Sequence, residues 1–395
     1  MGERVFVLGV GMTKFSKPVA DGPSYLDLGQ EAVAAAMADS GLDNSAIQQA
    51  YAAYIYGETC CGQRVLYRSG FYEIPIFNVN NACASGSTAL YQLKRSIEAG
   101  LLDCGLAVGF EQMQKGSIDV GWTDRPTPLS RHFGRMKSER GIGKAPAAPQ
   151  IFGNAGRYYM EKYGITAETF ARVAAKNHRN SVGNPNAQFR DEYSVAEILD
   201  SPMVWDPLTR LQCSPTSNGA AAAVLASERF VREHGLQQRA VEILASQLVT
   251  DPASTFESND ADLAGAGMTR AASHAAYVES GKGPEDLDVI ELHDCFSTNE
   301  LITYDGLGLC DEGGGGKLID SGATDHGGDV VVNPSGGLIS KGHPIGATGL
   351  AQCHELTTQL RNEAGPRQVP GASVALQHNL GLGGACVINI FGRPQ

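Results

Sequence analysis

Short apolar runs rich in Val, Ile and Ala alternate along the chain with longer stretches in which small and apolar residues recur at helical spacing. In the first half, this pattern predicts strands at residues 5–10, 50–55, 76–79 and 104–109 and helices at 26–40 and 83–99. In the second half, it predicts strands at 241–248, 287–292, 330–333, 374–376 and 385–391 and helices at 269–280 and 346–360. Such alternation is typical of an α/β protein built in layers.

The same order of elements occurs twice, which suggests an internal duplication into two β-α-β-α-β halves. In this register the segment around Cys83 matches the segment around His343. The stretch between the halves differs: it is rich in proline and basic residues and then shows helical patterns over 153–177. We therefore expect an inserted cap at 119–205, an N-terminal half at 1–118 plus about 206–240, and a C-terminal half at 241–395.

Composition narrows the class of protein. The chain has 395 residues, 42% hydrophobic and 19% charged, with 48 glycines, so it can bury a large core. A net charge of −12 and the lack of a basic stripe argue against nucleic acid as a partner.

The sequence shows neither a membrane span nor a targeting signal, and this absence guides the predicted cellular location. The longest apolar run, 219–226, is too short for a membrane span, which needs about 20 residues. The first residues read as a strand and not as a signal peptide, and the final Arg393-Pro394-Gln395 is no peroxisomal signal. The 9 cysteines follow no regular spacing, so we expect a reduced, cytoplasmic protein.

Three segments far apart in the chain place nucleophilic or proton-transferring side chains among small residues. They are Asn81-Ala82-Cys83-Ala84-Ser85-Gly86, His293-Asp294-Cys295-Phe296 and Gly342-His343-Pro344-Ile345-Gly346. Acyl transfer to and from sulfur needs a thiolate, a group that moves protons and donors for an oxyanion. The two thiols and two imidazoles of these segments predict that chemistry.

Cys83 follows a predicted strand and opens a predicted helix. At such a position the free N–H groups and the helix dipole favour a thiolate. A buried structural cysteine is the alternative interpretation.

His343 lies among five glycines in residues 335–349, in an irregular loop that enters a helix. Such a loop would hold the ring against a substrate, whereas the alternative is a histidine packed in the core. The loop lacks the Lys-Ser/Thr ending of a Walker motif and the spacing of a dinucleotide motif.

His293 and Cys295 follow the predicted strand at 287–292, and strand ends are where layered α/β sheets place functional groups. An ordinary loop is the alternative. The two residues are too close together, and lack a second spaced pair, for a zinc site, so we expect no metal. Farther on, the segment from His378 to Gly384 could turn backbone N–H groups toward a cavity as an oxyanion hole, or simply connect two strands.

Together, these four segments resemble the thiolase superfamily and, within it, the thiolases of the sterol carrier protein X type. The resemblance runs through essentially the whole chain. Residues 293–296 read H-D-C-F where ordinary thiolases carry N-E-A-F, and His378 stands where those thiolases place a second cysteine. The resemblance implies the thiolase fold: duplicated halves that form a five-layered α-β-α-β-α core with an inserted loop or cap domain.

The resemblance also implies roles for the catalytic residues. Cys83 would be the nucleophile that takes the acyl group, and Cys295 the acid or base that serves the leaving group. His343 would activate Cys83 and donate into a first oxyanion hole, and His293 would stand where ordinary thiolases use an Asn to hold a water. The backbone N–H groups of Cys83 and Leu380 would form a second hole, beside His378.

Coenzyme A would be a co-substrate bound under the cap, with no permanently bound cofactor. Its contacts are not readable from the sequence, and the weak candidates are Arg131, Arg135, Lys137 and Lys144. A homodimer or a higher oligomer follows from the family alone.

The reaction implied is cleavage of a 3-oxoacyl-CoA by coenzyme A, or the reverse Claisen condensation, since the sequence does not set the direction. One alternative is an aldolase of the same fold, which cleaves a steroid side-chain 3-hydroxyacyl-CoA together with a partner protein. Another is a non-catalytic carrier of lipid or acyl-CoA, although the chain ends where the lipid-binding module of sterol carrier protein X would begin. A synthase of the ketoacyl type shares the fold and uses a Cys-His-His or Cys-His-Asn set, which His293, His343 and His378 would allow, but Cys295 favours a thiolase.

Overall fold

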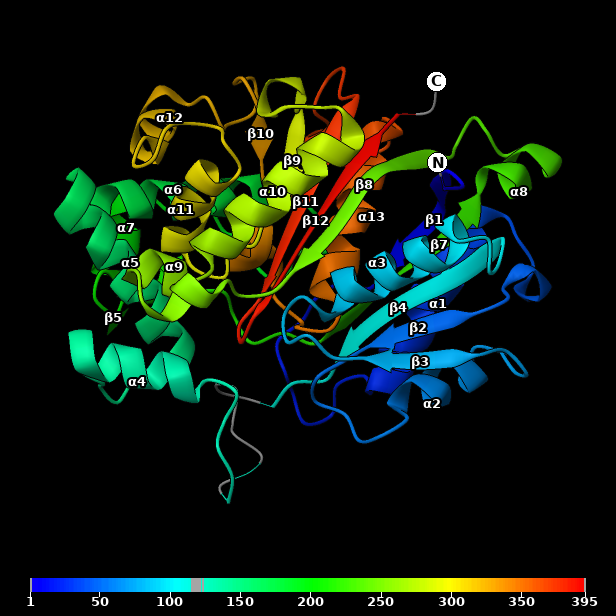
Figure 1. Ribbon diagram of the computed structural model, residues 1–395, viewed down its shortest axis with the longest axis horizontal. Helices are drawn as coiled ribbons and strands as arrows, with labels where there is room; N and C mark the ends of the chain where they lie inside the picture. The colour runs from blue at the N-terminus through cyan, green and yellow to red at the C-terminus, as the bar shows by residue number, and fades with distance from the viewer. Residues whose placement is uncertain (1, 115–121, 123, 394–395) are drawn as a thin grey trace.

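The structure is a computed structural model, in which residues 2–114, 122 and 124–393 are described. Ten strands form one mixed sheet in the order β10-β9-β11-β12-β8-β1-β7-β4-β2-β3 (Figure 1). Each half of the chain contributes five neighbouring strands to this order.

The N-terminal half supplies β1 (Val5–Met12), β2 (Ala50–Ala53), β3 (Ile76–Val79), β4 (Cys104–Glu111) and β7 (Gly219–Ser227). Strand β2 runs parallel to β3 and β4, and β7 is antiparallel to both β4 and β1. The C-terminal half supplies β8 (Val241–Val249), β9 (Val289–Glu291), β10 (Val331–Val332), β11 (Val374–Gly381) and β12 (Ala385–Gly392).

The second set of strands repeats the topology of the first. Strand β9 runs parallel to β10 and β11, and β12 is antiparallel to both β11 and β8. The halves meet where β1 pairs with β8, at Phe6 opposite Glu242 and Val7 opposite Val241. The predicted duplication is therefore present in the order and direction of the strands.

The elements form five layers (Figure 1). The five strands of each half form one layer, and helices lie between these two layers and on the outer face of each. The central layer is α3 (Ser85–Glu98) and α13 (Thr348–Leu360), which contact each other and strands of both halves. One outer layer is α1 (Tyr25–Ser40) with α2 (Cys61–Arg68), and the other is α10 (Ala266–Ser280) with α11 (Ser297–Gly306). The predicted thiolase fold with its five layers is confirmed.

The inserted segment forms α4 (Ser130–Glu139), α5 (Ala147–Tyr163), α6 (Ala167–Ser181), α7 (Val195–Asp200) and a small sheet of β5 (Met203–Trp205) and β6 (Leu208–Thr209). Three shorter helices lie elsewhere: α8 (Glu228–Glu233), α9 (Asp260–Leu263) and α12 (Gly315–Ser321). The buried residues Ile151, Phe152 and Phe170 of the insertion join the hydrophobic cluster of the C-terminal half. The insertion thus packs on that half, while the domain boundaries stay a prediction and residues 119–121 and 123 lie outside the described residues.

Two predicted helices begin later than the apolar pattern indicated. The helix predicted at 83–99 begins at Ser85, because Ala82 takes a left-handed conformation (φ 47°) that forms a turn before it. The helix predicted at 346–360 begins at Thr348. In both halves, the residue of chemical interest therefore lies on a turn just ahead of the helix. Among the described residues, no helix combines the length and apolar character of a membrane span.

The packing between the halves leaves no room for a side chain at Gly109. A Cβ atom there would lie 2.2 Å from the carbonyl oxygen of Gly346, in the loop that carries His343. We therefore predict that Gly109→Ala lowers the free energy of unfolding by roughly 1–3 kcal/mol, as expected for overpacking of a tight core. Urea denaturation measures this change.

The matched control is Gly134→Ala on α4, where no atom lies within 4 Å of the added Cβ. This variant should be neutral, or gain roughly 0.5–1 kcal/mol from helix propensity. Equal stability of the two variants would contradict the proposed close contact.

Candidate active site

Cys83 lies on a tight turn between β3 and α3. The hydroxyl of Ser85 accepts from the N–H of Asn81 (2.8 Å) and donates to the carbonyl of Ala82 (2.6 Å). These two bonds hold the left-handed turn at Ala82, so the thiol is presented by a fixed backbone. Small residues here let a substrate approach the sulfur.

The thiol of Cys83 is held neutral in the free protein. Burial raises its pKa to about 12, and the charge of Glu111 adds to this effect. The backbone N–H groups of Leu382 and of Cys83 itself oppose the shift, because they donate to the sulfur. We expected the helix terminus to favour a thiolate, but a helix dipole supplies at most about 2 kcal/mol and burial outweighs it.

His343 is one of two imidazoles with a ring nitrogen within 4.8 Å of the Cys83 sulfur. It follows a π-helical turn, Gly337–Lys341, and its backbone N–H donates to the Ser217 hydroxyl (2.9 Å). Its Nδ1 lies 2.7 Å from the Thr348 hydroxyl, which donates to the carbonyl of Pro344 (3.0 Å). Thr348 therefore accepts from Nδ1–H, which leaves Nε2 of His343 bare as a proton acceptor. Burial lowers the pKa of His343 to about 3.

Glu111 ties this loop to the N-terminal half. Its carboxylate accepts from the backbone N–H groups of Gly346 (2.9 Å), Tyr56 (2.7 Å) and Ile55 (3.1 Å). Burial raises the pKa of Glu111 to about 7, against the effect of these three bonds. The side chain thus joins the end of β4 to the turn that leads into α13.

His293 comes from the C-terminal half, at the end of β9. Its ring packs edge-on against that of His343, with centroids 5.2 Å apart and planes at 82°. One ligand atom from each of Cys83, His293 and His343 lies within 4.8 Å of the others. Burial and the two neighbouring imidazoles His343 and His378 hold the pKa of His293 well below its ordinary value. The structure therefore brings one thiol and two neutral imidazoles together.

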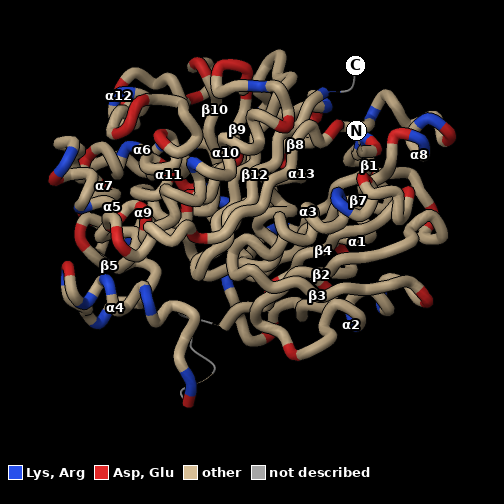
Figure 2. The backbone as a smooth tube through the Cα atoms, viewed as in Figure 1, with Lys and Arg blue, Asp and Glu red and all other residues tan. Residues whose placement is uncertain are grey.

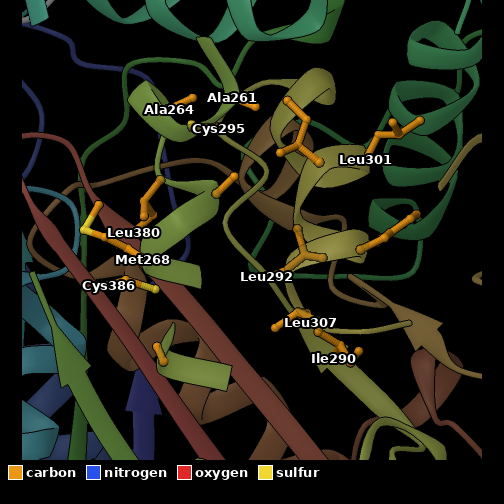
Figure 3. Close-up of a cluster of buried hydrophobic side chains, with 14 of the residues drawn as sticks. Ala261, Ala264, Met268, Ile290, Leu292, Cys295, Leu301, Leu307, Leu380 and Cys386 are labelled. Carbon is orange, nitrogen blue, oxygen red and sulfur yellow. The ribbon is translucent and has the colours of Figure 1, made fainter. Parts of the chain in front are cut away.

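Cys295 completes the group. It is buried and packs with the hydrophobic cluster that includes Ala261, Ala264 and Met268 (Figure 3). Burial, followed by the charge of Cys83, raises its pKa well above the ordinary value. A thiol that stays protonated, and that lies near enough to Cys83 for the charge of that residue to affect its pKa, is suited to give a proton to carbon.

His378 and Leu380 lie on β11, which pairs with β9. His378 Nδ1 accepts from the backbone N–H of His293 (3.4 Å), and its Nε2 lies 3.0 Å from the hydroxyl of Thr269. Both ring nitrogens of His378 therefore have hydrogen-bond partners within the protein. This favours a role for His378 in positioning His293 over a role in direct proton transfer. Leu380 pairs with Cys386 in the ladder. The backbone amide that faces the Cys83 sulfur is that of Leu382, so the role expected of Leu380 stays a prediction.

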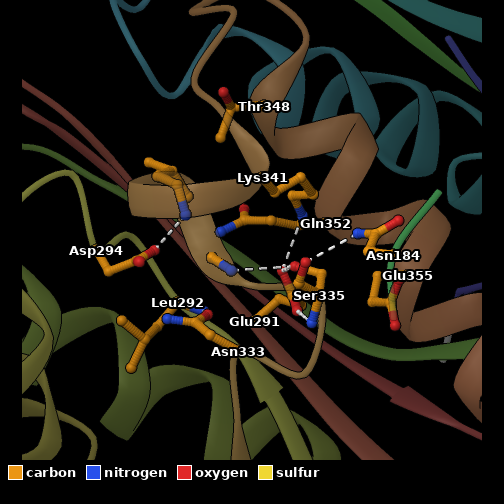
Figure 4. A network of polar contacts seen from close by, with 12 residues as sticks. Asn184, Glu291, Leu292, Asp294, Asn333, Ser335, Lys341, Thr348, Gln352 and Glu355 are labelled. Carbon is orange, nitrogen blue, oxygen red and sulfur yellow. Dashed lines mark hydrogen bonds and ion pairs between the residues drawn. The ribbon is translucent and has the colours of Figure 1, made fainter. Parts of the chain in front are cut away.

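A network of buried charges lies under the His343 loop (Figure 4). Lys341 Nζ is 3.0 Å from a Glu291 carboxylate oxygen, and Glu291 also accepts from the Ser335 hydroxyl (2.7 Å). Asp294 accepts from the backbone N–H of Leu338 (2.7 Å). A Cβ at Gly337 would lie 2.1 Å from that carboxylate, so only glycine fits there.

A second buried pair extends the network. Lys176 of α6 lies 2.5 Å from Glu300 of α11, and Asn177 donates to both Asp294 (2.8 Å) and Glu300 (2.7 Å). The cap, strand β9 and the His343 loop are thereby joined through side chains with almost no contact with solvent.

The four basic residues expected to bind coenzyme A lie in the cap, on α4 and in the loop that follows it. Helix α4 carries several positive residues (Figure 2). Arg131 stacks over Phe256, Arg135 pairs with Glu139, and Lys137 and Lys144 are exposed. Among the described residues, none of these four contacts Cys83, His293, Cys295 or His343, so their role stays a prediction.

Sequence reasoning assigned no role to Thr348, Asn379, Glu111 or Leu382. Asn379 is adjacent to His378 in a segment already singled out, and its amide lies 3.0 Å from His293 Nδ1. The signal available was therefore a run of three polar residues, Gln377 to Asn379, inside a buried strand. Only the packing of strands and helices tells which atom it faces.

Comparison with known families matches the chain to two models. Residues 5–229 match the model described as thiolase, N-terminal domain, and residues 253–392 match the thiolase C-terminal domain-like model.

Two curated relatives cover nearly the whole chain. Sterol carrier protein 2 of Rattus norvegicus is 56% identical over 397 residues, which cover 99% of this chain and 73% of the relative. Acetyl-CoA acetyltransferase of Methanothermobacter thermautotrophicus is 34% identical over 395 residues, 98% of this chain and 99% of the relative. Among solved structures, the Ltp2-ChsH2(DUF35) aldolase has a TM-score of 0.84 at 22% identity, over 99% of this chain and 98% of that chain. At that identity the likeness shows the fold alone.

The raised pKa of Cys83 predicts how its alkylation depends on pH. With a pKa of about 12, the thiolate fraction should rise about tenfold per pH unit between pH 6.5 and 9. The rate of iodoacetamide labelling at Cys83, followed by peptide mass spectrometry, should rise by the same factor. The exposed Cys60 in the same digest controls for reagent delivery. A rate that levels off between pH 6.5 and 8 would instead mean a thiolate–imidazolium pair at rest.

The buried pair of Lys341 and Glu291 predicts a large loss of stability when one partner is removed. Lys341→Met leaves the Glu291 carboxylate buried without its cation, which costs about 3–5 kcal/mol. The urea midpoint, at fixed protein concentration, should fall accordingly. Lys137→Met changes an exposed lysine and should stay within about 0.5 kcal/mol of the parent. An unchanged midpoint for Lys341→Met would refute the pair's structural role.

Proposed function

The chain belongs to the thiolase family, and we propose that it cleaves a 3-oxoacyl-CoA with coenzyme A through an acyl-enzyme on Cys83. The products would be a shortened acyl-CoA and acetyl-CoA or propionyl-CoA, as part of fatty-acid or sterol side-chain degradation. The observation that carries this proposal is the grouping of Cys83, His293 and His343 within 4.8 Å, with Cys295 close enough for the charge of Cys83 to affect its pKa.

In the first half-reaction, the bare Nε2 of His343 accepts the thiol proton while the Cys83 sulfur attacks the 3-keto carbon. The carbon–carbon bond breaks, and Cys295 gives its proton to the departing carbanion of acetyl-CoA or propionyl-CoA. Backbone N–H groups beside the sulfur would stabilise the oxyanion of the tetrahedral intermediate. His293 and the protonated His343 would hold the thioester oxygen of the enolate.

In the second half-reaction, the Cys295 thiolate takes the proton of coenzyme A. The sulfur of coenzyme A then attacks the acyl group, and Cys83 leaves and recovers its proton from His343. Both thiols and both imidazoles return to their starting state. Dividing one difficult step into two in this way is the general benefit of covalent catalysis.

We also propose that the protein forms a homodimer. Strand β3 is the last strand in the sheet order, and Phe77 on it is 47% exposed. Tyr72, just before this strand, is 61% exposed. Exposed aromatic residues at an open sheet edge fit a homodimer contact. A cytoplasmic location and coenzyme A binding near the basic residues of the cap complete the proposal.

The alternatives are less well supported. An aldolase or a non-catalytic carrier has no evident use for a second buried thiol such as Cys295, whose pKa burial raises so that it stays protonated. The relatives at 56% and 34% identity do not favour either alternative.

The test is thiolysis of a panel of 3-oxoacyl-CoAs, from acetoacetyl-CoA to long and 2-methyl-branched chains, with products identified by mass spectrometry. We predict that the parent cleaves at least one member and that Cys83→Ala loses both acyl-enzyme and turnover. Cys295→Ala should lose thiolysis by a factor of at least about 100, the usual contribution of a proton-transferring group. It should still be acylated at Cys83 by an acyl-CoA.

Near-normal thiolysis by Cys295→Ala would show that another group moves the proton. No cleavage of any substrate by the folded parent would overturn the thiolase proposal and turn attention to the aldolase reaction.

A further inference from the structure

A line of buried polar side chains runs from the central helices to His293. It begins at Gln377 on β11, whose Nε2 donates to the carbonyl of Gly349 on α13 (2.5 Å). A carbonyl oxygen only accepts hydrogen bonds, so this contact fixes which end of the Gln377 amide carries the hydrogens. The other end, Oε1, accepts from Asn389 Nδ2 (2.9 Å), which agrees with the same orientation.

The orientation of Gln377 determines that of Ser87 on α3. Gln377 Nε2 lies 2.8 Å from the Ser87 hydroxyl and donates to it. The single hydroxyl proton of Ser87 is then free to go to Asn379 Oδ1, 2.8 Å away. Gly349 allows this contact, because a Cβ there would lie 2.2 Å from the Ser87 oxygen. The Asn379 amide is thereby fixed with its nitrogen toward His293.

We infer that Asn379, fixed by Ser87 and Gln377, is a positioning residue that holds His293 with its proton on Nε2. The Nδ2–H of Asn379 points at His293 Nδ1 over 3.0 Å, and Nδ1 must accept it with a lone pair. A neutral imidazole has one N–H, so the proton lies on Nε2, the ring nitrogen that Asn379 does not engage. The catalytic use of this tautomer rests on the proposed function, whereas the tautomer itself is inferred from the hydrogen bonds alone.

The two neighbouring imidazoles are therefore held in opposite tautomers. Thr348 accepts a hydrogen bond from Nδ1–H of His343, which leaves Nε2 of that ring bare, whereas Asn379 donates a hydrogen bond to His293 Nδ1, so Nε2 of that ring carries the proton. One ring can accept the proton of the Cys83 thiol, and the other can donate to a substrate oxygen from the start. Neither ring needs to turn.

The same arrangement opposes metal binding. Cys83, His293 and His343 lie close enough to share an ion, but a ligating histidine needs a bare nitrogen toward the metal. Replacing Asn379 by Asp would reverse the tautomer, because a carboxylate accepts from Nδ1–H and frees Nε2. Carboxylate–histidine contacts of this kind change metal affinity about 10- to 100-fold.

The experiment has two measurements that need no turnover. Nitrogen-15 spectra of the parent labelled at histidine distinguish protonated from bare ring nitrogens, and His293→Asn assigns the His293 signals. We expect His293 to carry its proton on Nε2 and His343 on Nδ1. A His293 proton on Nδ1 would overturn the inference.

The second measurement is titration with Co²⁺, whose absorption reports thiolate and imidazole ligands. Asn379→Asp should bind Co²⁺ about 10- to 100-fold more tightly than the parent. The double variant Asn379→Asp with His293→Asn should lose this gain, because the freed ligand is gone. Equal affinity of parent and Asn379→Asp would overturn the inference.

The outcome is separable from that of the proposed function. A parent with the expected tautomers but no thiolysis would retain the inference and remove the proposed reaction. Active thiolysis with the His293 proton on Nδ1 would support the proposed reaction and remove the inference about Asn379. If Asn379→Asp fails to fold, the spectra of the parent still decide.

Discussion

The ion pair between Lys341 and Glu291 is the contact on which the site geometry depends. Glu291 ends β9, two residues before His293, and Lys341 lies two residues before His343. The pair thus joins the two segments that supply the imidazoles. Both side chains are buried, so each charge needs the other to offset the loss of water. A loop that moved away would leave a bare charge in the core, and the loop is therefore restricted to one position.

The duplicated architecture explains why Cys83 and His343 meet. Each lies on the turn between a short parallel strand and a central helix, at corresponding places in the two halves. Since α3 and α13 pack against each other, the two turns are brought to one side of the central layer. His293 and Cys295 come from a different crossover, at the end of β9. The duplication thus brings the nucleophile Cys83 together with the base His343. The second thiol, Cys295, follows β9 in the C-terminal half and has no counterpart in the N-terminal half.

Much of this arrangement could be predicted from the sequence, and the failures have physical causes. Apolar periodicity located the strands, with β3 at its predicted residues 76–79, because buried strands and helices differ in spacing. It misplaced the start of α3, since nothing in an alanine signals that Ala82 turns left-handed. The segments around Cys83, His293 and His343 were expected to share a site, and their atoms do lie together. The contacts of Thr348 and Asn379 could not be predicted, because they depend on which side chains from remote elements end within 3 Å.

Burial gives this site a resting state without charges on the groups that react. It raises the pKa of both thiols and lowers the pKa of the imidazoles, so each of these groups is neutral before substrate arrives. Charge then appears only as bonds change, next to donors and acceptors whose directions are already set by Thr348 and Asn379. Such preorganisation spares the protein the cost of turning dipoles during the reaction. A solvated site could stabilise a resting thiolate better, but it would also quench a carbanion with water. A site of mostly buried side chains, with one bare and one protonated ring nitrogen, answers both demands, and the buried ion pairs behind it hold its shape.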